Sequence, residues 1–323
     1  MKKKERANMR EIRLAVFDFD NTLWENMRTS EIAVRGFITR LSRDSGLSED
    51  SIKAGTRKAF ENNFIFEYPD SIRHNPVLQD AFPGEDLNTR FAGAIHAFHD
   101  AIREQTRPYA GIRNMLRRLK LSGIKLVCYS ESSARVLANL MKPMGIDSLF
   151  DIVCSTPSAP QYAKSADERM TLRDVSHGLS TRQMEVAGMP EGTSPKDHPE
   201  ILSMLLDAMN VQPHEAVMVG DHLVRDVDMA QKIGVRGFWA KYGRDSVPTL
   251  TMSAALRPYV QHLCEQHVQG THNHVVPHAV LHQPEDLLRH IGRPMERKVL
   301  PFPRPAPKQA ASIQVMADNG NLR

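Results

Sequence analysis

The sequence predicts an α/β fold, in which a parallel sheet is interrupted directly after its first strand by an inserted helical segment. Three observations predict it. Short apolar runs alternate with helix-sized amphipathic segments over residues 107–243, which is the pattern of repeated strand–helix–strand units. A first apolar run at residues 14–17 is followed by residues 25–106, which have helical periodicity and little strand signal. Several of the apolar runs end in polar residues of a similar kind, as expected at one edge of a parallel sheet.

The first of these runs, residues 14–17, is typical of a strand that is buried on both faces. Asp18 and Asp20 follow where the strand should end, and Asn21-Thr22 is typical of a turn. Ligands of open α/β sheets bind outside the carboxyl ends of the strands, and unpaired carboxylates are costly to bury. Taken alone, the run also fits a strand that ends in a solvated acidic turn.

Residues 25–106 are expected to form a small helical insertion placed directly after the first strand. The apolar spacing over residues 32–41 predicts a helix that ends near Gly46, followed by a second over about 48–60 and a third over about 86–104. The intervening stretch, residues 69–84, is rich in Pro and Gly and is expected to be a loop.

The α/β core is expected to comprise residues 10–24 and 107–292. Residues 155–194 are polar and rich in Pro, Ser, Thr and Gly, so we expect a long insertion with a short helix at about 180–187, either a lid or disordered. Residues 293–323 are proline-rich and are expected to be a disordered tail. The remaining expected strands are 124–129, 150–154, 216–219, 237–240 and 279–281, and the remaining expected helices are 112–121, 134–141, 200–209, 227–233, 253–267 and 285–291.

The composition of the 323 residues is that of an ordinary globular protein, with 41% hydrophobic residues and a formal net charge of +4. Such a small charge gives no reason to expect a nucleic-acid or membrane partner. The three cysteines show no metal-ligand spacing, and no apolar run has the length of a signal peptide core or a membrane span. We therefore expect a cytoplasmic protein, and the sequence leaves the oligomeric state open.

Acidic, hydroxyl and amine side chains follow the predicted strands in a consistent way. Because parallel strands point in one direction, their carboxyl ends share an edge and these side chains are expected to converge. Carboxylates gathered in one crevice require a counter-charge, and Mg²⁺ with oxygen ligands and substrate phosphate is the natural one. A lysine beside them would neutralise an anionic group that is transferred. The residues concerned are Asp18, Asp20, Ser130, Lys196, Asp221 and Asp226.

These residues resemble the four motifs of the haloacid dehalogenase (HAD) superfamily. The matching positions are Asp18-Phe19-Asp20-Asn21-Thr22, Ser130, Lys196, and Gly220-Asp221 with Asp226. The resemblance covers roughly residues 13–243 together with the terminal strand and helix. It implies a Rossmann-like core with a C1-type helical cap, and a Mg²⁺-dependent phosphohydrolase acting on a small phosphomonoester.

The resemblance also implies roles for the catalytic residues. Asp18 would be the nucleophile that forms an aspartyl-phosphate, and Asp20 would be the general acid and base. An aspartate at this second position separates the phosphatases from the dehalogenases that name the superfamily. Lys196 would stabilise the nucleophile and the phosphoryl group together.

Further positions are assigned by the same resemblance. Thr22, Ser130, its neighbour Glu131 and Lys196 would bind the substrate. Mg²⁺ would be held by Asp18, Asp20 (through its backbone carbonyl), Asp221 and Asp226. For Asp226, an acid favoured by the dipole of a helix N-terminus is the structural alternative.

Several alternatives stay open. A phosphotransferase or mutase would pass the phosphoryl group to a hydroxyl, a non-catalytic protein would keep the fold for binding, and scattered basic clusters hint at nucleic-acid phosphate ends. Lys164 is a rival for the role of Lys196. Candidate specificity residues are Trp24, Asn62, Arg73 and His74, and a weak zinc hypothesis rests on His272, His274 and His278.

Overall fold

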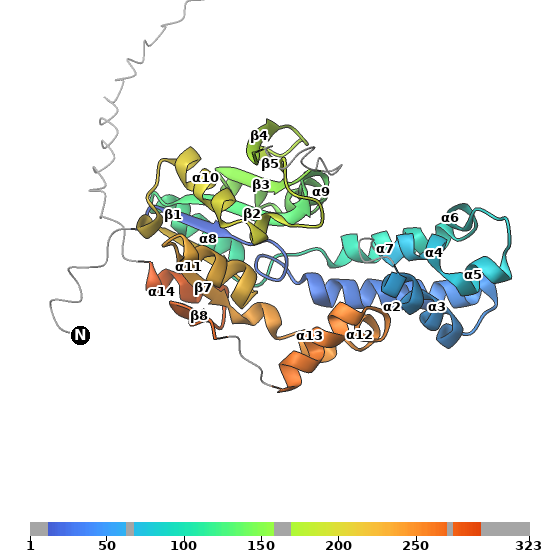
Figure 1. Cartoon of the computed structure of the whole chain (residues 1–323). Helices are drawn as coiled ribbons and strands as arrows, with labels where there is room; N and C mark the ends of the chain where they lie inside the picture. The colour runs from blue at the N-terminus through green and yellow to red at the C-terminus, as the bar shows by residue number, and fades with distance from the viewer. Residues whose placement is uncertain (1–11, 63–67, 158–168, 270–273, 292–323) are drawn as a thin grey trace, which may run out of the picture. The chain divides into compact units, whose positions relative to one another are not determined.

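An eight-stranded sheet forms the core of the structure (Figure 1), a computed structural model that describes residues 12–62, 68–157, 169–269 and 274–291. The strand order is β4-β5-β3-β2-β1-β6-β7-β8, and every neighbouring pair is parallel except β4 with β5. The predicted α/β class with a parallel sheet is therefore confirmed. The strands are β1 (Leu14–Phe17), β2 (Lys125–Ser133), β3 (Ile152–Thr156), β4 (Thr171–Val175), β5 (Arg182–Ala187), β6 (Ala216–Gly220), β7 (Arg236–Ala240) and β8 (Ala279–Leu281).

Strand β1 lies at the centre of the sheet, between β2 and β6. Its four residues are fully buried, because alternate side chains enter the apolar cores on the two faces. Ala15 and Phe17 face one core, and Leu14 and Val16 face the other. This two-sided burial explains why β1 is a continuous apolar run rather than an alternating one.

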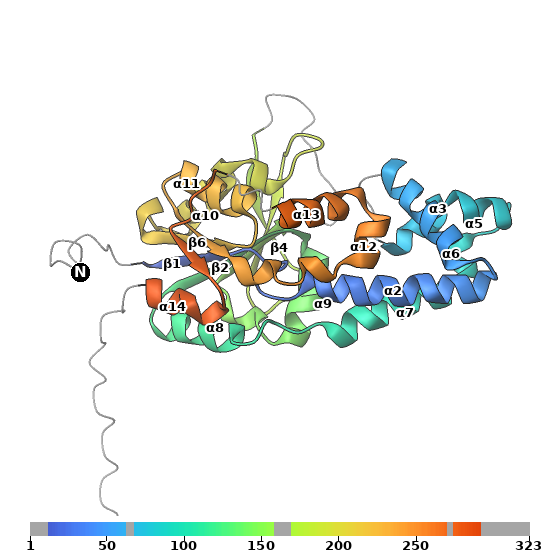
Figure 2. The same ribbon diagram turned by 90° about the horizontal axis from the view of Figure 1, so that it is seen from below.

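Helices cover both faces of the sheet (Figure 2). On the face of Phe17 lie α8 (Ile112–Leu121), α9 (Ala134–Met144) and α14 (Leu287–His290). On the opposite face lie α10 (Pro199–Met209) and α11 (Met229–Lys232), which follows a π-helical turn, η5 (Leu223–Asp228). None of the helices in the described part of the chain has both the length and the apolar character needed to cross a membrane.

The segment between β1 and α8 is helical, with an apolar core of its own. Two of its helices, α2 (Asn26–Ser45) and α7 (Ala92–Gln105), lie side by side in both views. Helix α12 (Thr251–Leu256) comes from the far end of the chain, yet its Met252 and Leu256 complete this core. The helices are α2 (Asn26–Ser45), α3 (Glu49–Asn62), α4 (Ser71–His74), α5 (Pro76–Ala81), α6 (Leu87–Arg90) and α7 (Ala92–Gln105).

The loop predicted over residues 69–84 is wrong, because most of this stretch is helical. Pro76 occupies the first turn of α5, where a missing N–H costs nothing. The side chain of Asn75 caps the helix by accepting hydrogen bonds from the N–H groups of Val77 (3.0 Å) and Leu78 (3.2 Å). Pro76 thus starts a helix here instead of preventing one.

The short helix predicted at residues 180–187 is also wrong, since residues 182–187 form strand β5. β5 pairs in parallel with β3 and antiparallel with β4, so the polar insertion contributes a hairpin to the sheet. Met184 and Val186 share one face of β5 and enter the core. The periodicity of such a short segment fits a helix and a strand equally well. The segment forms a strand because it pairs with the edge of β3 that β2 leaves open.

The helix predicted over residues 253–267 is two helices, α12 and α13 (Pro258–Gln269), because Pro258 begins a new helix and leaves Arg257 extended between them. The predicted tail, residues 293–323, lies outside the described residues.

Candidate active site

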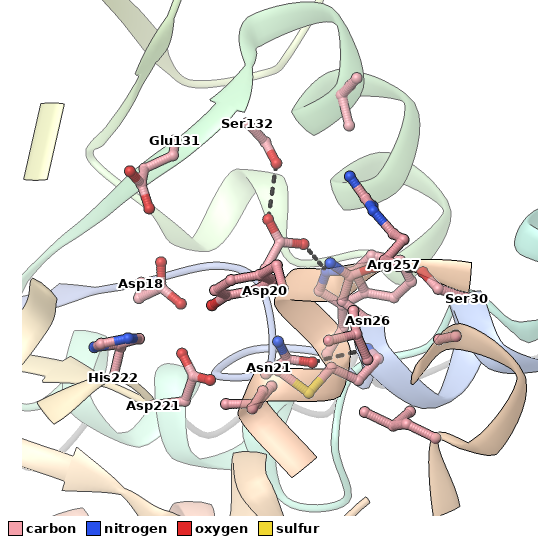
Figure 3. Close-up of a pocket in the computed structure, with 18 of the residues that line it drawn as sticks. Asp18, Asp20, Asn21, Asn26, Ser30, Glu131, Ser132, Asp221, His222 and Arg257 are labelled. Atoms are coloured by element: carbon pink, nitrogen blue, oxygen red, sulfur yellow. Dashed lines mark hydrogen bonds between the residues drawn. The ribbon is translucent and has the colours of Figure 1, made fainter. Parts of the chain in front are cut away.

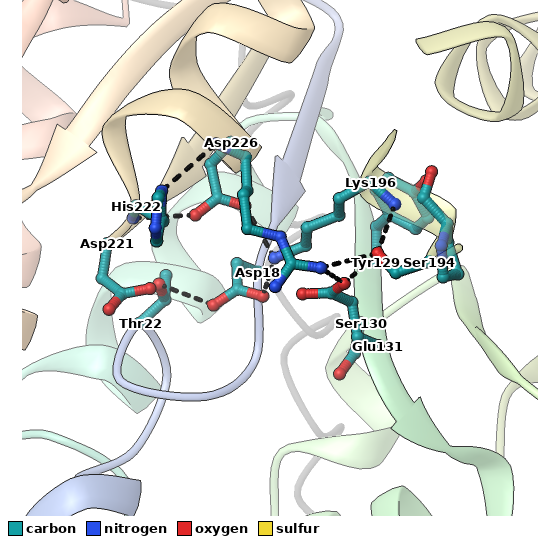
Figure 4. Close-up of polar contacts among 12 residues, drawn as sticks. Asp18, Thr22, Tyr129, Ser130, Glu131, Ser194, Lys196, Asp221, His222 and Asp226 are labelled. Carbon is teal, nitrogen blue, oxygen red and sulfur yellow. Dashed lines mark hydrogen bonds and ion pairs between the residues drawn. The ribbon is translucent and has the colours of Figure 1, made fainter. Parts of the chain in front are cut away.

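Asp18 follows the last residue of β1, and its carboxylate is held from two sides (Figure 4). The Thr22 hydroxyl donates a hydrogen bond to Asp18 Oδ2 at 3.1 Å, and Lys196 forms an ion pair with Asp18 Oδ1. Asp18 is 4% exposed. Burial raises the pKa of Asp18 well above its usual range, and Lys196 only partly offsets this.

Lys196 is the buried cation of the site. Besides Asp18, its ammonium group lies 2.6 Å from Asp226 Oδ1. Burial opposes the charged form, but the carboxylates of Asp18 and Asp226 outweigh it and raise the pKa of Lys196. Lys196 lies in a short 3₁₀ turn that Ser194 caps, because the Ser194 hydroxyl accepts a hydrogen bond from the Lys196 N–H at 3.3 Å. The Tyr129 hydroxyl of β2 donates a hydrogen bond to the carbonyl oxygen of Pro195 in the same turn.

Asp221 and Asp226 come from the end of β6 and from the π-helical turn after it. The N–H of His222 donates to Asp226 Oδ2 at 2.9 Å, and Arg244 Nε lies 3.1 Å from Asp221 Oδ2. Glycine at position 220 allows the Asp226 side chain to lie against the backbone at the end of β6, because a Cβ there would lie 2.2 Å from Asp226 Cγ. Burial raises the pKa of Asp221 to about 6.

The donor set fits a hard divalent cation. One carboxylate oxygen from each of Asp18, Asp221 and Asp226 lies within 4.8 Å of the others, and all three residues are buried. Two basic side chains, Lys196 and Arg244, form ion pairs with these three carboxylates. The carboxylates therefore outnumber the cations, and Asp20 nearby adds a further acidic group. Oxygen ligands and excess negative charge are what Mg²⁺ prefers. The described residues contain no second acidic, His or Cys group of this kind.

Asp20 is held by two hydrogen bonds (Figure 3). The Ser132 hydroxyl donates to Asp20 Oδ2 at 2.8 Å, and the indole N–H of Trp24 donates to Oδ1 at 2.9 Å. Burial raises the pKa of Asp20 even though both hydrogen bonds lower it. The hydrogen bonds therefore fix the orientation of the Asp20 carboxyl group, and the raised pKa favours its protonated form. Both properties suit a general acid and base.

The two remaining substrate-binding candidates lie beside the site in different ways. Ser130 is buried, and its hydroxyl accepts a hydrogen bond from the Ser132 N–H at 3.0 Å. Glu131 lines the cavity in front of Asp18, but its carboxylate forms an ion pair with Arg225 and accepts a hydrogen bond from the Ser194 hydroxyl.

Among the other candidates, Trp24 is buried beside Asp20, whereas Asn62, Arg73 and His74 are exposed and do not line the cavity. Lys164 and His272 lie outside the described residues. Sequence reasoning missed Ser132, Arg225 and Arg244. Ser132 had a signal, since it belongs to the polar run at the end of β2, but Arg244 lies in a stretch without a recognisable pattern.

A cavity of about 490 Å³ opens in front of these residues. Asp18, Asp20, Lys196, Asp221 and Asp226 line it, as do residues of the helical segment and of the C-terminal helices. This volume is of the size that binds small molecules.

Gly243 is expected to be essential for the geometry of the turn after β1. A Cβ at this position would lie 1.9 Å from the carbonyl oxygen of Asn21 and 2.9 Å from Asp221 Cβ. Asn21 already has a positive φ of 59°, so this backbone has little freedom to yield. We expect Gly243→Ala to lower the free energy of unfolding by about 1–3 kcal/mol, measured by urea titration.

Gly36→Ala is the matched control for this substitution. Gly36 lies inside α2, and apart from the adjacent residues and the nearby backbone of this helix no atom lies within 4 Å of the position that an alanine methyl group would take there. Alanine should therefore stabilise the protein by about 0.5–1 kcal/mol. Equal stability of the two variants would contradict the steric role of Gly243.

A family model for haloacid dehalogenase-like hydrolases matches residues 12–234. The chain belongs to this family. Among curated proteins it is similar to a glyceraldehyde 3-phosphate phosphatase of Pyrococcus furiosus, with 25% identity over 73% of this chain and 83% of that protein. It is also similar to a phosphoserine phosphatase of Thermus thermophilus, with 23% identity over 72% of this chain and 90% of that protein.

Solved structures of HAD-family proteins are also similar. A putative HAD-hydrolase of Bacillus subtilis, described as bound to magnesium, is 14% identical and aligns with 87% of this chain and 99% of that chain, with a TM-score of 0.48.

Proposed function

We propose that this HAD-like hydrolase is a Mg²⁺-dependent phosphatase that cleaves a small phosphomonoester through an aspartyl-phosphate on Asp18. The observation that carries the proposal is the grouping of Asp18, Asp221 and Asp226 within 4.8 Å, with Lys196 ion-paired to two of them. The curated relatives named above are phosphatases, which supports the reaction class.

In the proposed reaction, Asp18 Oδ attacks phosphorus and the P–O bond to the leaving group breaks. Asp20 donates a proton to the leaving oxygen, which its raised pKa favours. Asp20 then takes a proton from the water that attacks phosphorus, and the P–O bond to Asp18 breaks to release phosphate. The hydrogen bonds from Ser132 and Trp24 hold Asp20 in place for both transfers.

The surrounding residues stabilise charge. Lys196 neutralises the phosphoryl oxygens and Asp18 together, and Thr22 orients the Asp18 carboxylate. Ser130 would donate to a phosphoryl oxygen. Glu131 would act mainly by positioning Arg225, because its carboxylate is already paired.

Asp18, Asp221, Asp226 and the backbone carbonyl of Asp20 would hold Mg²⁺, which supplies charge neutralisation of the phosphoryl group when bound. The proposal treats residues 25–106 as a cap over residues 10–24 and 107–292, and it places the enzyme in the cytoplasm, as three free cysteines favour.

The direct test is a screen of phosphate esters with and without Mg²⁺, run in ¹⁸O-water. Hydrolysis places ¹⁸O in the released phosphate, whereas transfer to a hydroxyl does not. Absence of turnover on every ester with Mg²⁺ present would favour a non-catalytic binding protein.

Removal of divalent cations is expected to abolish turnover. EDTA should stop hydrolysis and excess Mg²⁺ should restore it, because the clustered carboxylates would otherwise repel the phosphate.

Asp221→Asn should raise the Mg²⁺ concentration for half-maximal rate roughly 10- to 100-fold. Asp207→Asn, on the exposed face of α10, is the control and should leave it unchanged. An Asp221→Asn enzyme with the wild-type Mg²⁺ requirement would contradict the assigned ligand set.

A further inference from the structure

The cavity that Asp18 and Asp20 line also has a large apolar wall. Three stretches that are distant in sequence build this wall, namely α7, α9 and the segment from Leu250 to Leu263. An apolar wall of this extent is suited to the body of an organic substrate rather than to phosphate alone. Its residues are Phe98, Ile102, Val136, Leu140, Val260 and Leu263.

The C-terminal part of the wall lies on α13, which together with α12 before it is beyond residue 234, where the family match ends. It is anchored to the helical segment by Glu31 of α2. The Glu31 carboxylate is buried and accepts hydrogen bonds from the N–H groups of Met252 (2.9 Å) and Ser253 (2.8 Å) at the start of α12. This stretch of chain is therefore held at the cavity by a specific contact.

Arg257, between α12 and α13, brings a positive charge to the cavity. Its guanidinium carbon lies 4.7 Å from the centre of the Phe60 ring and 5.3 Å from that of Tyr68. These buried rings hold the group in place by cation–π contacts. No carboxylate of the described residues pairs with the Arg257 guanidinium, whereas the other basic side chains with an ion pair in the cavity lining each have at least one carboxylate partner: Lys196, Arg225 and Arg244.

We propose that Arg257 binds a second anionic group of the substrate, and thus determines specificity. The substrate class is then a phosphomonoester whose apolar body ends in a carboxylate or a second phosphate. The proposal rests on the proposed function, because the reacting phosphate must lie at Asp18 while the second anion lies at Arg257. A guanidinium forms two parallel hydrogen bonds to either anion, and the apolar wall strengthens them by excluding water.

The test measures binding rather than turnover. Calorimetry with Mg²⁺ compares ω-carboxyalkylphosphonates of increasing chain length with their carboxyl methyl esters, which have the same body and no second charge. At the best chain length we expect the wild-type protein to bind the acid about 10- to 100-fold more tightly than the ester. Bisphosphonates of the same lengths show which of the two anions is preferred.

Arg257→Gln should bring the ratio of acid to ester affinity close to one while ester affinity is kept. Arg57→Gln is the matched control, because Arg57 donates hydrogen bonds to Ala255 O (3.2 Å) and Gln261 Oε1 (2.8 Å) of the same helices without lining the cavity. It should preserve the ratio.

The proposal is overturned if the wild-type protein shows no preference for acid or bisphosphonate at any length, if Arg257→Gln keeps the preference, or if Arg57→Gln loses it equally. Failure of the proposed function is seen separately, as phosphonate binding without hydrolysis of any ester.

Discussion

Asp18→Asn is expected to lower kcat for phosphate esters about 10⁴-fold or more, because an amide oxygen is a poor nucleophile towards phosphorus. The substitution preserves shape and still accepts the hydrogen bond from Thr22, so the fold should survive. Steady-state kinetics with Mg²⁺ measures the effect. Acid quenching of the wild-type reaction during turnover should trap phosphate on the chain, and the variant should trap none.

The control for this experiment is Asp50→Asn, whose side chain is 94% exposed on α3 and which should retain wild-type kcat. If Asp18→Asn hydrolysed esters at more than a small fraction of the wild-type rate, Asp18 would not be the nucleophile. The cluster of Asp18, Asp221 and Asp226 would then have to act by activating a bound water molecule that attacks phosphorus.

Lys196→Met is expected to have the largest effect on stability. It leaves Asp18 and Asp226 buried without their cation, and breaking a buried pair in this way costs about 3–5 kcal/mol. Urea unfolding in the absence of Mg²⁺ measures the loss. Turnover should also fall severely, since the phosphoryl charge loses its neutralising group.

Two further measurements separate charge from packing in this prediction. Adding Asp226→Asn to Lys196→Met should recover part of the lost stability, because one of the uncompensated charges is removed. Lys232→Met removes an exposed ion pair with Asp228 and should change stability by no more than about 0.5 kcal/mol. A Lys196→Met protein as stable as Lys232→Met would show that the buried lysine does not compensate the carboxylates.

Much of the core was predictable from sequence because its signals are local. The apolar run of β1, the polar residues at the end of β2 and after β6, and the caps of the helices are all recognisable within a few residues. Residues 69–84 were predicted wrongly because proline is typical of loops and equally of the first turn of a helix, where Pro76 lies. Residues 180–187 were predicted wrongly because residues 182–187 pair with β3, a contact that periodicity does not reveal.

The candidate site divides in a similar way. Asp18, Asp20, Asp221 and Asp226 were recognisable because each follows a strand, and parallel strands place such residues at one edge. The partners that complete them were not recognisable. Arg244 reaches Asp221 from beyond β7, and the hydrogen bond from Ser132 to Asp20 depends on how β2 ends.

The amino-acid sequence by itself determined the class of fold, the order of its strands and helices in broad outline, and the kinds of reactive groups at the strand ends. Only the tertiary structure decided that Glu131 forms an ion pair with Arg225. It also decided that Arg257 lines the same cavity as Asp18. The physical reason is range. Periodicity and turn chemistry act over a few residues, whereas these contacts join segments that only the packed core brings together.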